Sequence, residues 1–507
     1  MPQRTYLWVV AFVSGMSVMA IEMTASRLVA PYFGTSLFVW ANVIGMIMAA
    51  LAVGYWFGGK LAERLPNIKT LLWLLCAAAL LAGLIPFAVA PFSHLVISQL
   101  VVASGALLIA LGSFLVLLLL FAAPIMLMGM TSPFLIKLLT EAGPSTRSRS
   151  LGAGETAGGV FALSTVGSLV GTFAPAFYFV PTIGTRATVL LFAGILLVTV
   201  LFGFLGRRAI VAAVVFLLVP WAAQLPVRAS EQALAEAESP YQYIQILESH
   251  GARLLRFNEG MADQSEEYPD TPYTGRYWDT IYPLPNLTKA EKPRVLILGL
   301  ATGTIARGII QTRPPGSVHV TGVEIDAKVV EFGRRFFSLD KLPADQLDIV
   351  IEDARTFLQR TDQKYDMILV DAYANQLYIP PHMASQEFFT LAKSRLNPGG
   401  ILVANVNTPL VTSPLLTSIV KTMKTVYPHV DISHVPQSWN RIIIASDQEI
   451  DWEGARSRLP EELWQIYANV MNERADIDSS TGILLTDDRA PVELMTDAMI
   501  FDAYRKK

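Results

Sequence analysis

The chain has 507 residues, of which 52% are hydrophobic and only 16% are charged. This composition is too apolar for an average soluble enzyme, so we expect two unlike parts. The formal net charge is −3 and the Lys and Arg residues are dispersed, which argues against DNA or RNA as a partner.

Apolar runs of membrane-spanning length occupy the chain from Thr5 to about Leu225, and turn-forming and charged residues return after Pro226. Because a crossing needs about 20 apolar residues, we predict a transmembrane helical bundle of about seven spans over 1–226. The predicted spans are 5–27, 37–59, 70–91, 99–123, 155–180, 187–206 and 209–225. The fourth span either continues as a Pro-broken helix to Lys137 or returns as an eighth span. The only cysteine, Cys76, lies inside a span, so no intrachain disulfide can form.

Three of the loops between these spans are basic. They contain Lys60, Arg64 and Lys69, then Lys137, Arg147 and Arg149, then Arg207 and Arg208. The positive-inside rule makes these loops cytoplasmic, and with seven spans it puts the C-terminal part of the chain outside.

Two alternating segments follow the apolar region, YQYIQILES (Tyr241–Ser249) and ARLLRFNEG (Ala252–Gly260), with a His-Gly turn between them. A period of two on either side of a turn predicts a β-hairpin. We therefore assign 227–290 to a linker and a small β-unit.

Buried-type strands and helical stretches alternate through the remainder, 291–507. The strands are RVLILGL, VHVTGVEID, LDIVIEDA, YDMILVDAY and GILVANVN. This alternation predicts a doubly wound, mostly parallel sheet, a Rossmann-like fold of the methyltransferase type. In such sheets a ligand binds outside the carboxyl ends of the strands.

Chemistry-bearing residues stand at those strand ends. A loop with Gly299 and Gly303 follows the first strand, where glycine lets the backbone approach a ligand closely. Glu324 ends the second strand, at the spacing typical of an acid that accepts from ribose hydroxyls. Asp353 and Asp371 follow the third and fourth strands, so one edge carries three carboxylates.

This acidic edge favours a nucleoside with a positive centre over a nucleotide. The glycine loop has no P-loop Lys-Ser/Thr, and three carboxylates would repel a pyrophosphate. A sulfonium compound, S-adenosylmethionine or its decarboxylated form, has ribose hydroxyls, an adenine amine and a cation that match the edge.

Metal chemistry has little support in the sequence, and we expect no metal site. The six histidines form no close ligand pair with Cys or a carboxylate: His94, His250, His319, His382, His429 and His434. Nor does a Ser-His or Cys-His nucleophile pattern stand out.

The order of short motifs resembles the spermidine synthases, the polyamine aminopropyltransferases. The motifs are YQYIQI, YTGRYWDTI, VLILGLATGT, GVEID, EDARTFL, YDMILVDAY and FFTLAKSRLNPGGILVANV. Upstream, GMTSPFLIK and GVFALSTVGSLVGTFAPAFYFVPTIGT are similar to the membrane domain of fused major-facilitator-like spermidine synthase homologues.

The resemblance implies a role for each residue of the expected site. Glu324 would bind ribose, Asp353 the adenine edge and Asp371 the attacking amine. Gly299, Thr302 and Gly303 would form the cofactor loop, and Gln242, Tyr277 and Tyr373 would border the substrate cleft.

Two positions depart from the family pattern. Where aminopropyltransferases typically have GGGDG, with an Asp that holds the amine of the donor's propyl chain, this chain has Thr302. Where they have a second Asp in DxxDP, this chain has Ala374. The acidic stretch DQSEEYPD (Asp263–Asp270) either supplies the missing cation anchors or is an ordinary solvated loop.

The expected function is a membrane-anchored aminopropyltransferase that uses decarboxylated S-adenosylmethionine and releases methylthioadenosine. Its partners would be the lipid bilayer and an amine such as putrescine or another polyamine; a homo-oligomer is an open alternative. The alternatives are an S-adenosylmethionine-dependent methyltransferase, or a transporter or sensor with a regulatory nucleotide-binding domain. We expect a multi-pass protein of the inner or plasma membrane with a cytoplasmic catalytic domain, although the charge pattern with seven spans argues the opposite.

Overall fold

The computed structural model describes residues 3–33, 37–100, 105–141, 152–206, 233–258, 262–374 and 377–505. The chain divides into two compact units: Met1–Glu231 with Ala237–Pro240, and Gln232–Glu236 with Tyr241–Lys507. The predicted boundary at Pro226 lies outside the described residues, and the one at 290 stays a prediction.

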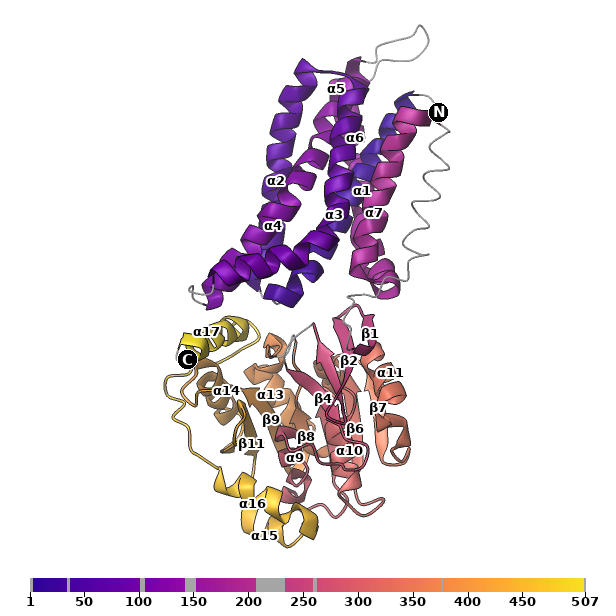
Figure 1. Ribbon diagram of the computed structural model, residues 1–507. Coiled ribbons are helices and arrows are strands. Elements are labelled where there is room, and N and C mark those ends of the chain that lie inside the picture. Colours follow the sequence, from indigo (N-terminus) through magenta and orange to yellow (C-terminus); the bar gives the residue numbers. More distant parts are fainter. Residues whose placement is uncertain are drawn as a thin grey trace. The chain divides into compact units, whose positions relative to one another are not determined.

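The first unit is a bundle of long helices (Figure 1). They are α1 (Gln3–Phe33), α2 (Leu37–Arg64), α3 (Ile68–Leu100), α4 (Gly105–Gly129), α5 (Thr131–Glu141), α6 (Ala153–Ala174) and α7 (Val180–Leu205), with a π-helical turn at Pro175–Phe179. Within the described residues, five helical segments are long and apolar enough to cross a membrane.

The last two of these five segments can be compared directly with the predicted spans. Ala110–Glu141 joins α4 and α5, as expected for a Pro-broken continuation of the fourth span. Ala153–Leu205 has 53 residues, and at ~1.5 Å per residue it is too long for one crossing. It is broken at Gly184, where φ is +81°, and it contains two predicted spans. The span 209–225 lies outside the described residues, so the count of seven stays a prediction.

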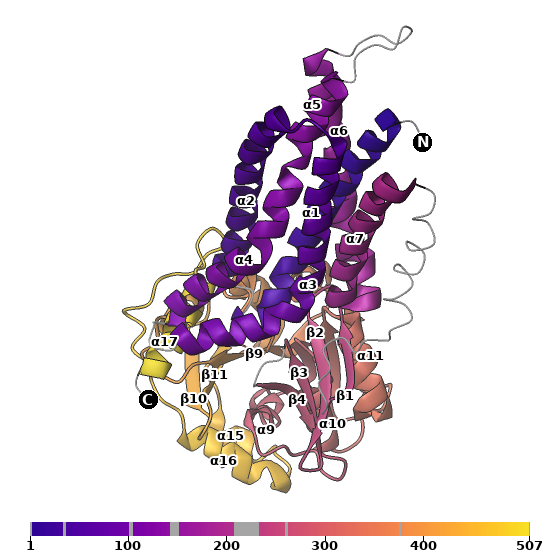
Figure 2. The same ribbon diagram turned by 45° about the horizontal axis from the view of Figure 1, so that its top comes forward.

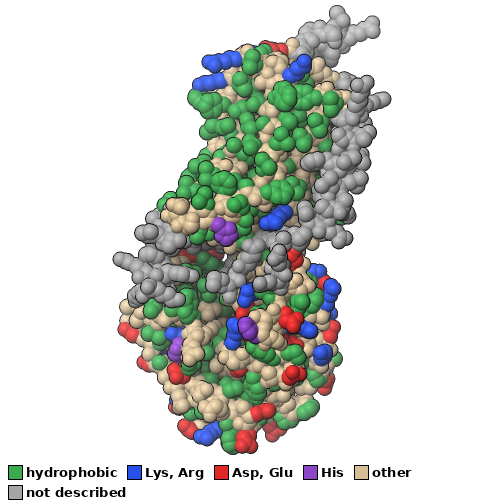
Figure 3. All heavy atoms as spheres, in the orientation of Figure 1, with side chains coloured by type: hydrophobic (Ala, Val, Ile, Leu, Met, Phe, Trp, Pro, Cys, Tyr) green, Lys and Arg blue, Asp and Glu red, His purple; other side chains and the backbone are tan. Residues whose placement is uncertain are grey.

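Small residues bring α1 and α6 into backbone contact. A Cβ atom on Gly171 would lie 2.0 Å from the Met16 carbonyl oxygen, and one on Gly167 would lie 2.1 Å from that of Phe12. The absence of side chains at these two glycines therefore allows the close packing of the two helices. On the face seen in Figure 3, the side chains of the helices are mostly hydrophobic. Large hydrophobic side chains of the bundle, such as those of Met48, Trp73 and Phe177, are exposed.

The end of α2 and helix α5 lie together at one end of this bundle. The Lys137 ammonium is 2.9 Å from the Glu63 carboxylate and 3.0 Å from that of Glu141. Arg147 and Arg149 of the second predicted basic loop lie outside the described residues. The side of the membrane on which this end lies stays a prediction.

The second unit begins with a small antiparallel sheet in the order β1-β2-β3-β4 (Figure 2). Its strands are β1 (Ala233–Glu238), β2 (Tyr243–Ser249), β3 (Ala252–Phe257) and β4 (Asp263–Glu267). The predicted hairpin corresponds to β2 and β3, joined at His250 and Gly251, both with positive φ. The solvated loop that was one of the two predictions for the acidic stretch is not observed at Asp263–Glu267, which form strand β4.

A seven-stranded sheet forms the centre of this unit, in the order β10-β11-β9-β8-β5-β6-β7. The strands are β5 (Arg294–Leu298), β6 (His319–Glu324), β7 (Leu347–Ile351), β8 (Tyr365–Val370), β9 (Leu396–Asn407), β10 (His429–His434) and β11 (Asn440–Ser446). Strands β5 to β9 are parallel, and β11 runs antiparallel to both of its neighbours. The predicted doubly wound, mostly parallel sheet is confirmed.

Alternate side chains of strand β5 enter two separate hydrophobic layers. Leu296 and Leu298 pack in one layer, and Val295 and Ile297 pack in the other. Helices α12 (Ala354–Arg360), α13 (Gln386–Ser394), α14 (Pro414–Lys424) and α17 (Val492–Arg505) contribute to the first layer. Helices α9 (Tyr277–Ile281), α10 (Thr304–Gln311), α11 (Ala327–Phe336), α15 (Trp452–Arg456) and α16 (Trp464–Asn472) contribute to the second.

Candidate active site

The predicted site residues of the parallel strands meet at one edge of the large sheet. Strands β8, β5, β6 and β7 are neighbours and run parallel. Asp371, the loop 299–303, Glu324 and Asp353 stand at or just after their carboxyl ends. This is the edge at which doubly wound sheets bind ligands.

The loop between β5 and α10 has an unusual backbone. Gly299, Ala301 and Gly303 all have positive φ, at +96°, +51° and +90°. A Cβ atom on Gly299 would lie 2.6 Å from the Asp371 carbonyl oxygen, so the loop crosses directly above β8 and only glycine fits there. Thr302 is 2% exposed, and its hydroxyl has no hydrogen-bond partner among the described residues.

Glu324 is buried beneath this loop. Its carboxylate accepts hydrogen bonds from the backbone amides of Ala301, at 2.8 Å, and Asp326, at 3.1 Å. Burial raises the pKa of Glu324 to about 7, although these amide donors act in the opposite direction. The pKa of Glu324 is therefore close to neutral pH, and a further hydrogen-bond donor to its carboxylate would favour the ionised form.

Asp353 begins helix α12. One carboxylate oxygen accepts from the Thr356 amide at 2.9 Å, and the other lies 3.4 Å from the His382 ring. Burial alone would raise the pKa of Asp353, but the Thr356 and His382 contacts hold it below its ordinary value. Helix capping explains one oxygen, and the predicted contact with adenine stays a prediction.

Asp371 receives one hydrogen bond on each carboxylate oxygen. The Tyr277 hydroxyl donates to Oδ2 at 2.9 Å, and the Asn405 side-chain amide donates to Oδ1 at 2.8 Å. Burial raises the pKa of Asp371 to about 6, and both donors lower it. Below about pH 6 the group is mostly protonated, and above it the group can accept a proton.

Two tyrosines stand beside Asp371 and remain neutral. Burial raises the pKa of Tyr277 and of Tyr373 well above the ordinary value, and the nearby Asp371 charge adds to the effect. The Tyr373 hydroxyl donates to the Asn405 carbonyl oxygen at 2.6 Å and accepts from the Asn407 amide at 3.1 Å. This pair of bonds fastens the loop after β8 to strand β9.

Gln242 lies beside the start of α11. Its amide is 3.4 Å from the Asp326 carboxylate, at the start of α11. It is not among the residues that line the cleft next to Tyr277 and Tyr373. Its predicted role at the substrate cleft stays a prediction.

A cleft of about 610 Å³ opens next to Tyr277 and Tyr373. This volume is within the ~300–1,000 Å³ range of small-molecule sites. Besides the tyrosines, its walls include Asp263 and Arg276, and residues 435–438 of the turn between β10 and β11.

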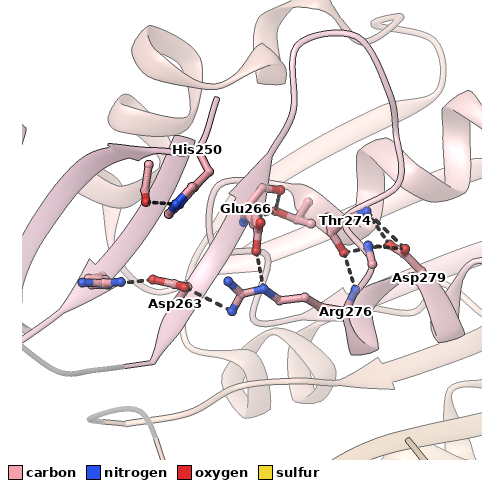
Figure 4. A network of polar contacts seen from close by, with 10 residues as sticks. His250, Asp263, Glu266, Thr274, Arg276 and Asp279 are labelled. Carbon is pink, nitrogen blue, oxygen red and sulfur yellow. Dashed lines mark hydrogen bonds and ion pairs between the residues drawn. The ribbon is translucent and has the colours of Figure 1, made fainter. Parts of the chain in front are cut away.

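Charged side chains on the cleft wall are mutually paired (Figure 4). The Arg276 guanidinium lies 3.1 Å from the Asp263 carboxylate and 2.5 Å from that of Glu266. Arg256 contacts the other oxygen of Asp263 at 2.6 Å. Because the side chains of Asp263 and Glu266 are 6% and 3% exposed, the solvated-loop reading is wrong for these two residues, and the cation-anchor reading stays a prediction.

The Asp279 carboxylate holds the turn that precedes α9 through hydrogen bonds. Asp279 accepts from the Thr274 amide at 3.0 Å, the Thr274 hydroxyl at 2.8 Å and the Gly275 amide at 2.8 Å (Figure 4). This fixed turn places Arg276 and Tyr277 on the cleft wall. Within the described ranges, no group of three His, Cys, Asp or Glu residues could hold a metal ion.

Comparison with known proteins agrees with this geometry. Residues 275–448 match the spermine/spermidine synthase domain. A polyamine aminopropyltransferase from Vibrio vulnificus is 31% identical over 278 residues, which cover 51% of this chain and 90% of that protein. The chain belongs to the polyamine aminopropyltransferase family. The predicted enzyme class, a transferase, follows from this membership.

Two further comparisons each cover about half of the chain. A probable polyamine aminopropyl transferase from Bifidobacterium longum is 32% identical over 284 residues, 51% of this chain and 61% of that protein. A crystal structure of a probable spermidine synthase from Corynebacterium glutamicum has 21% identity and a TM-score of 0.42, and covers 50% of this chain and 96% of that one.

Sequence reasoning missed several polar residues of this candidate site. Asn405 was read only as part of an apolar strand, although an Asn inside GILVANVN is itself a signal of a buried polar role. Asn440 follows Asn405 by 35 residues, and no local pattern joins them. Arg276 was quoted within YTGRYWDTI without a role.

Proposed function

We propose that the second unit transfers an aminopropyl group from decarboxylated S-adenosylmethionine to an amine acceptor. The observation that carries this proposal is Asp371, a carboxylate at the ligand-binding edge with a pKa of about 6 and one neutral donor on each oxygen. Such a group accepts a proton at neutral pH, which is what an attacking ammonium must lose.

In the proposed reaction, the acceptor loses a proton to Asp371 and its nitrogen lone pair attacks the propyl carbon bonded to the sulfonium. The carbon–sulfur bond breaks, its electron pair stays on sulfur, and neutral methylthioadenosine leaves. Asp371 then returns the proton to solvent. Most of the rate enhancement would come from holding the two reactants in line.

Residues on the other side of the edge fit the nucleoside of the donor. Glu324 would accept from the ribose hydroxyls, Asp353 would meet the adenine edge, and the loop of Gly299, Thr302 and Gly303 would pass close to the ligand. The positive φ values and the close approach of Gly299 to Asp371 support this assignment, because they require a compact loop. Gln242, Tyr277 and Tyr373 would border the bound substrates.

Methyl transfer from intact S-adenosylmethionine is the second candidate function. The buried position of Thr302, where the family pattern has a carboxylate for the donor's amine, is the observation that favours it. A neutral residue does not repel the carboxylate of the intact donor. In that reaction the acceptor would gain a methyl group and S-adenosylhomocysteine would leave.

The first unit would anchor the enzyme in the inner or plasma membrane as a multi-pass protein. Five long apolar helical segments with exposed large side chains support this part of the proposal. We place the catalytic unit in the cytoplasm, where the donor would be supplied. A reporter fused after Lys507 that is active only in the periplasm would contradict this placement.

The identity of the released nucleoside separates the two reactions. Purified full-length protein would be incubated with putrescine or another polyamine and with either decarboxylated or intact S-adenosylmethionine, and the products measured by mass spectrometry. We expect methylthioadenosine from the decarboxylated donor only. S-adenosylhomocysteine from the intact donor, without methylthioadenosine, would establish the second candidate instead.

A further inference from the structure

Three polar side chains form a chain of hydrogen bonds that ends on Asp371. The Asn405 amide donates to Asp371 Oδ1 at 2.8 Å. The Asn440 amide donates to Asn405 Oδ1 at 2.9 Å, and the Ser438 hydroxyl donates to Asn440 Oδ1. Asn405 and Asn440 are only 3% and 6% exposed, so water does not compete freely for these groups.

The direction of the chain follows from the end at Asp371. An ionised carboxylate only accepts hydrogen bonds, so the Asn405 NH2 group faces Asp371 and the Asn405 oxygen accepts from the Asn440 NH2 group. The Asn440 oxygen then accepts from the Ser438 hydroxyl, whose oxygen also accepts from the Asn440 backbone amide at 3.1 Å.

We propose that Ser438, Asn440 and Asn405 are positioning residues that hold Asp371 as an oriented hydrogen-bond acceptor. The role of Asp371 as the base rests on the proposed function, whereas the orientation of its carboxylate does not. A donor fixed in this direction stabilises the ionised carboxylate and disfavours the protonated acid.

The hydrogen bond from Asn405 is the one that orients Oδ1 of Asp371, because the other neighbouring groups contact Oδ2 or stay neutral. Tyr277, from α9, donates to the second oxygen, and Tyr373 lies in the loop that follows β8. Both phenols have raised pKa values and stay neutral across the working range. Burial and the Asn405 and Tyr277 hydrogen bonds set the pKa of Asp371.

The antiparallel strand β11 makes the chain possible. Asn440 is its first residue and pairs across the sheet with Asn407, which brings its side chain next to Asn405 on β9. Ser438 comes from the tight turn before β11, where Gln437 has a φ of +57°. Ser438 and Asn440 also line the cleft, so the chain connects the cleft wall to the base.

The strands that carry this chain also supply a matched control. At the opposite ends of β9 and β8, the Asn397 amide donates to the Asp366 carboxylate at 2.8 Å. Asn405→Asp and Asn397→Asp therefore make the same chemical change to the same kind of pair. Only the first should affect Asp371.

The primary test is the pH dependence of kcat/KM for the product that the wild-type protein forms. In Asn405→Asp, a second carboxylate against Asp371 should move the acidic limb upward from about pH 6 by about one pH unit or more. Ser438→Ala should move it upward by less, and Ser438→Thr, which keeps the hydroxyl, should restore it. Asn397→Asp should leave the limb unchanged.

A substrate-free measurement keeps the inference independent of the reaction. Carboxyl ¹³C NMR of the full-length protein labelled on aspartate, assigned by comparison with Asp371→Asn, would report the titration of Asp371 directly. We expect a midpoint near 6 that rises in Asn405→Asp and Ser438→Ala. An unchanged midpoint in both variants, or an equal rise in Asn397→Asp, would overturn the inference. Absence of any product from the wild type would refute the proposed function instead.

Discussion

Replacing Asp371 with Asn should abolish most activity and at the same time stabilise the folded protein. The change keeps the size of the side chain but removes its negative charge and its basicity. Loss of general-base assistance typically costs ~10²–10⁴ in rate. Nucleoside affinity should change little, because Glu324 and Asp353 lie on other strands.

The predicted gain in stability follows from the raised pKa of Asp371. An aspartate has an ordinary pKa of about 3.9, so folding favours the protonated form of a group whose pKa is about 6. The stability that Asp371 contributes is present at low pH and is lost as the pH rises through 6. At ~1.4 kcal/mol per pKa unit, a fully buried group would cost ~3 kcal/mol at pH 8. Because Asp371 is partly exposed, we expect about 1–2 kcal/mol.

Thermal unfolding of the full-length protein and the variant at pH 4.5 and pH 8 tests this sign. We expect Asp371→Asn to unfold a few degrees higher than the wild type at pH 8 and at a similar temperature at pH 4.5. Turnover at the wild-type rate at saturating donor and acceptor would refute the assignment of the base. The electrostatic reasoning would be refuted if the unfolding temperature of the variant, relative to that of the wild type, were lower at pH 8 than at pH 4.5.

Three further substitutions test other parts of the structure. Glu324→Gln should weaken methylthioadenosine binding, measured by calorimetry, and should have less effect on the rate at saturating substrate. The affinity of the wild type should fall as the pH drops below about 7, because Glu324 becomes protonated. Equal affinities of the variant and the wild type would contradict the ribose role. Asp279→Ala leaves three donors without their acceptor and should cost ~2–4 kcal/mol of stability in chemical denaturation, whereas the exposed Asp362→Ala should cost under ~0.5 kcal/mol. Gly171→Val should force α1 and α6 apart and reduce folded yield, whereas Gly158→Ala on the same helix meets no atom within 4 Å and should be tolerated; normal yield of the first variant would refute the close packing.

The parts of the site that the sequence predicts are those that follow from strand order. Glu324, Asp353 and Asp371 each end a strand, and parallel strands bring their carboxyl ends to one edge. The local sequence pattern was therefore enough to predict that these three carboxylates lie at the same edge of the sheet. The contact between Asn405 and Asn440 depends on β11 running antiparallel beside β9, which no local pattern specifies.

The acidic stretch at Asp263 was misread for a related reason. Its high charge density is typical of a solvated loop, but the structure pairs Asp263 with Arg256 from the neighbouring strand and with Arg276 from the turn before α9. Opposite charges from distant positions make burial of the strand possible. A sequence pattern shows the acids and not their partners.

Identification of both products from one reaction tests the central proposal most directly. Full-length protein, decarboxylated S-adenosylmethionine and a polyamine acceptor would be analysed together by mass spectrometry, with Asp371→Asn as the control. We expect methylthioadenosine and an acceptor that has gained one aminopropyl group in equal amounts, and at most about 1% of either product from the control in the same time. Methylthioadenosine without aminopropylated acceptor, or no product with any di- or polyamine, would contradict the account.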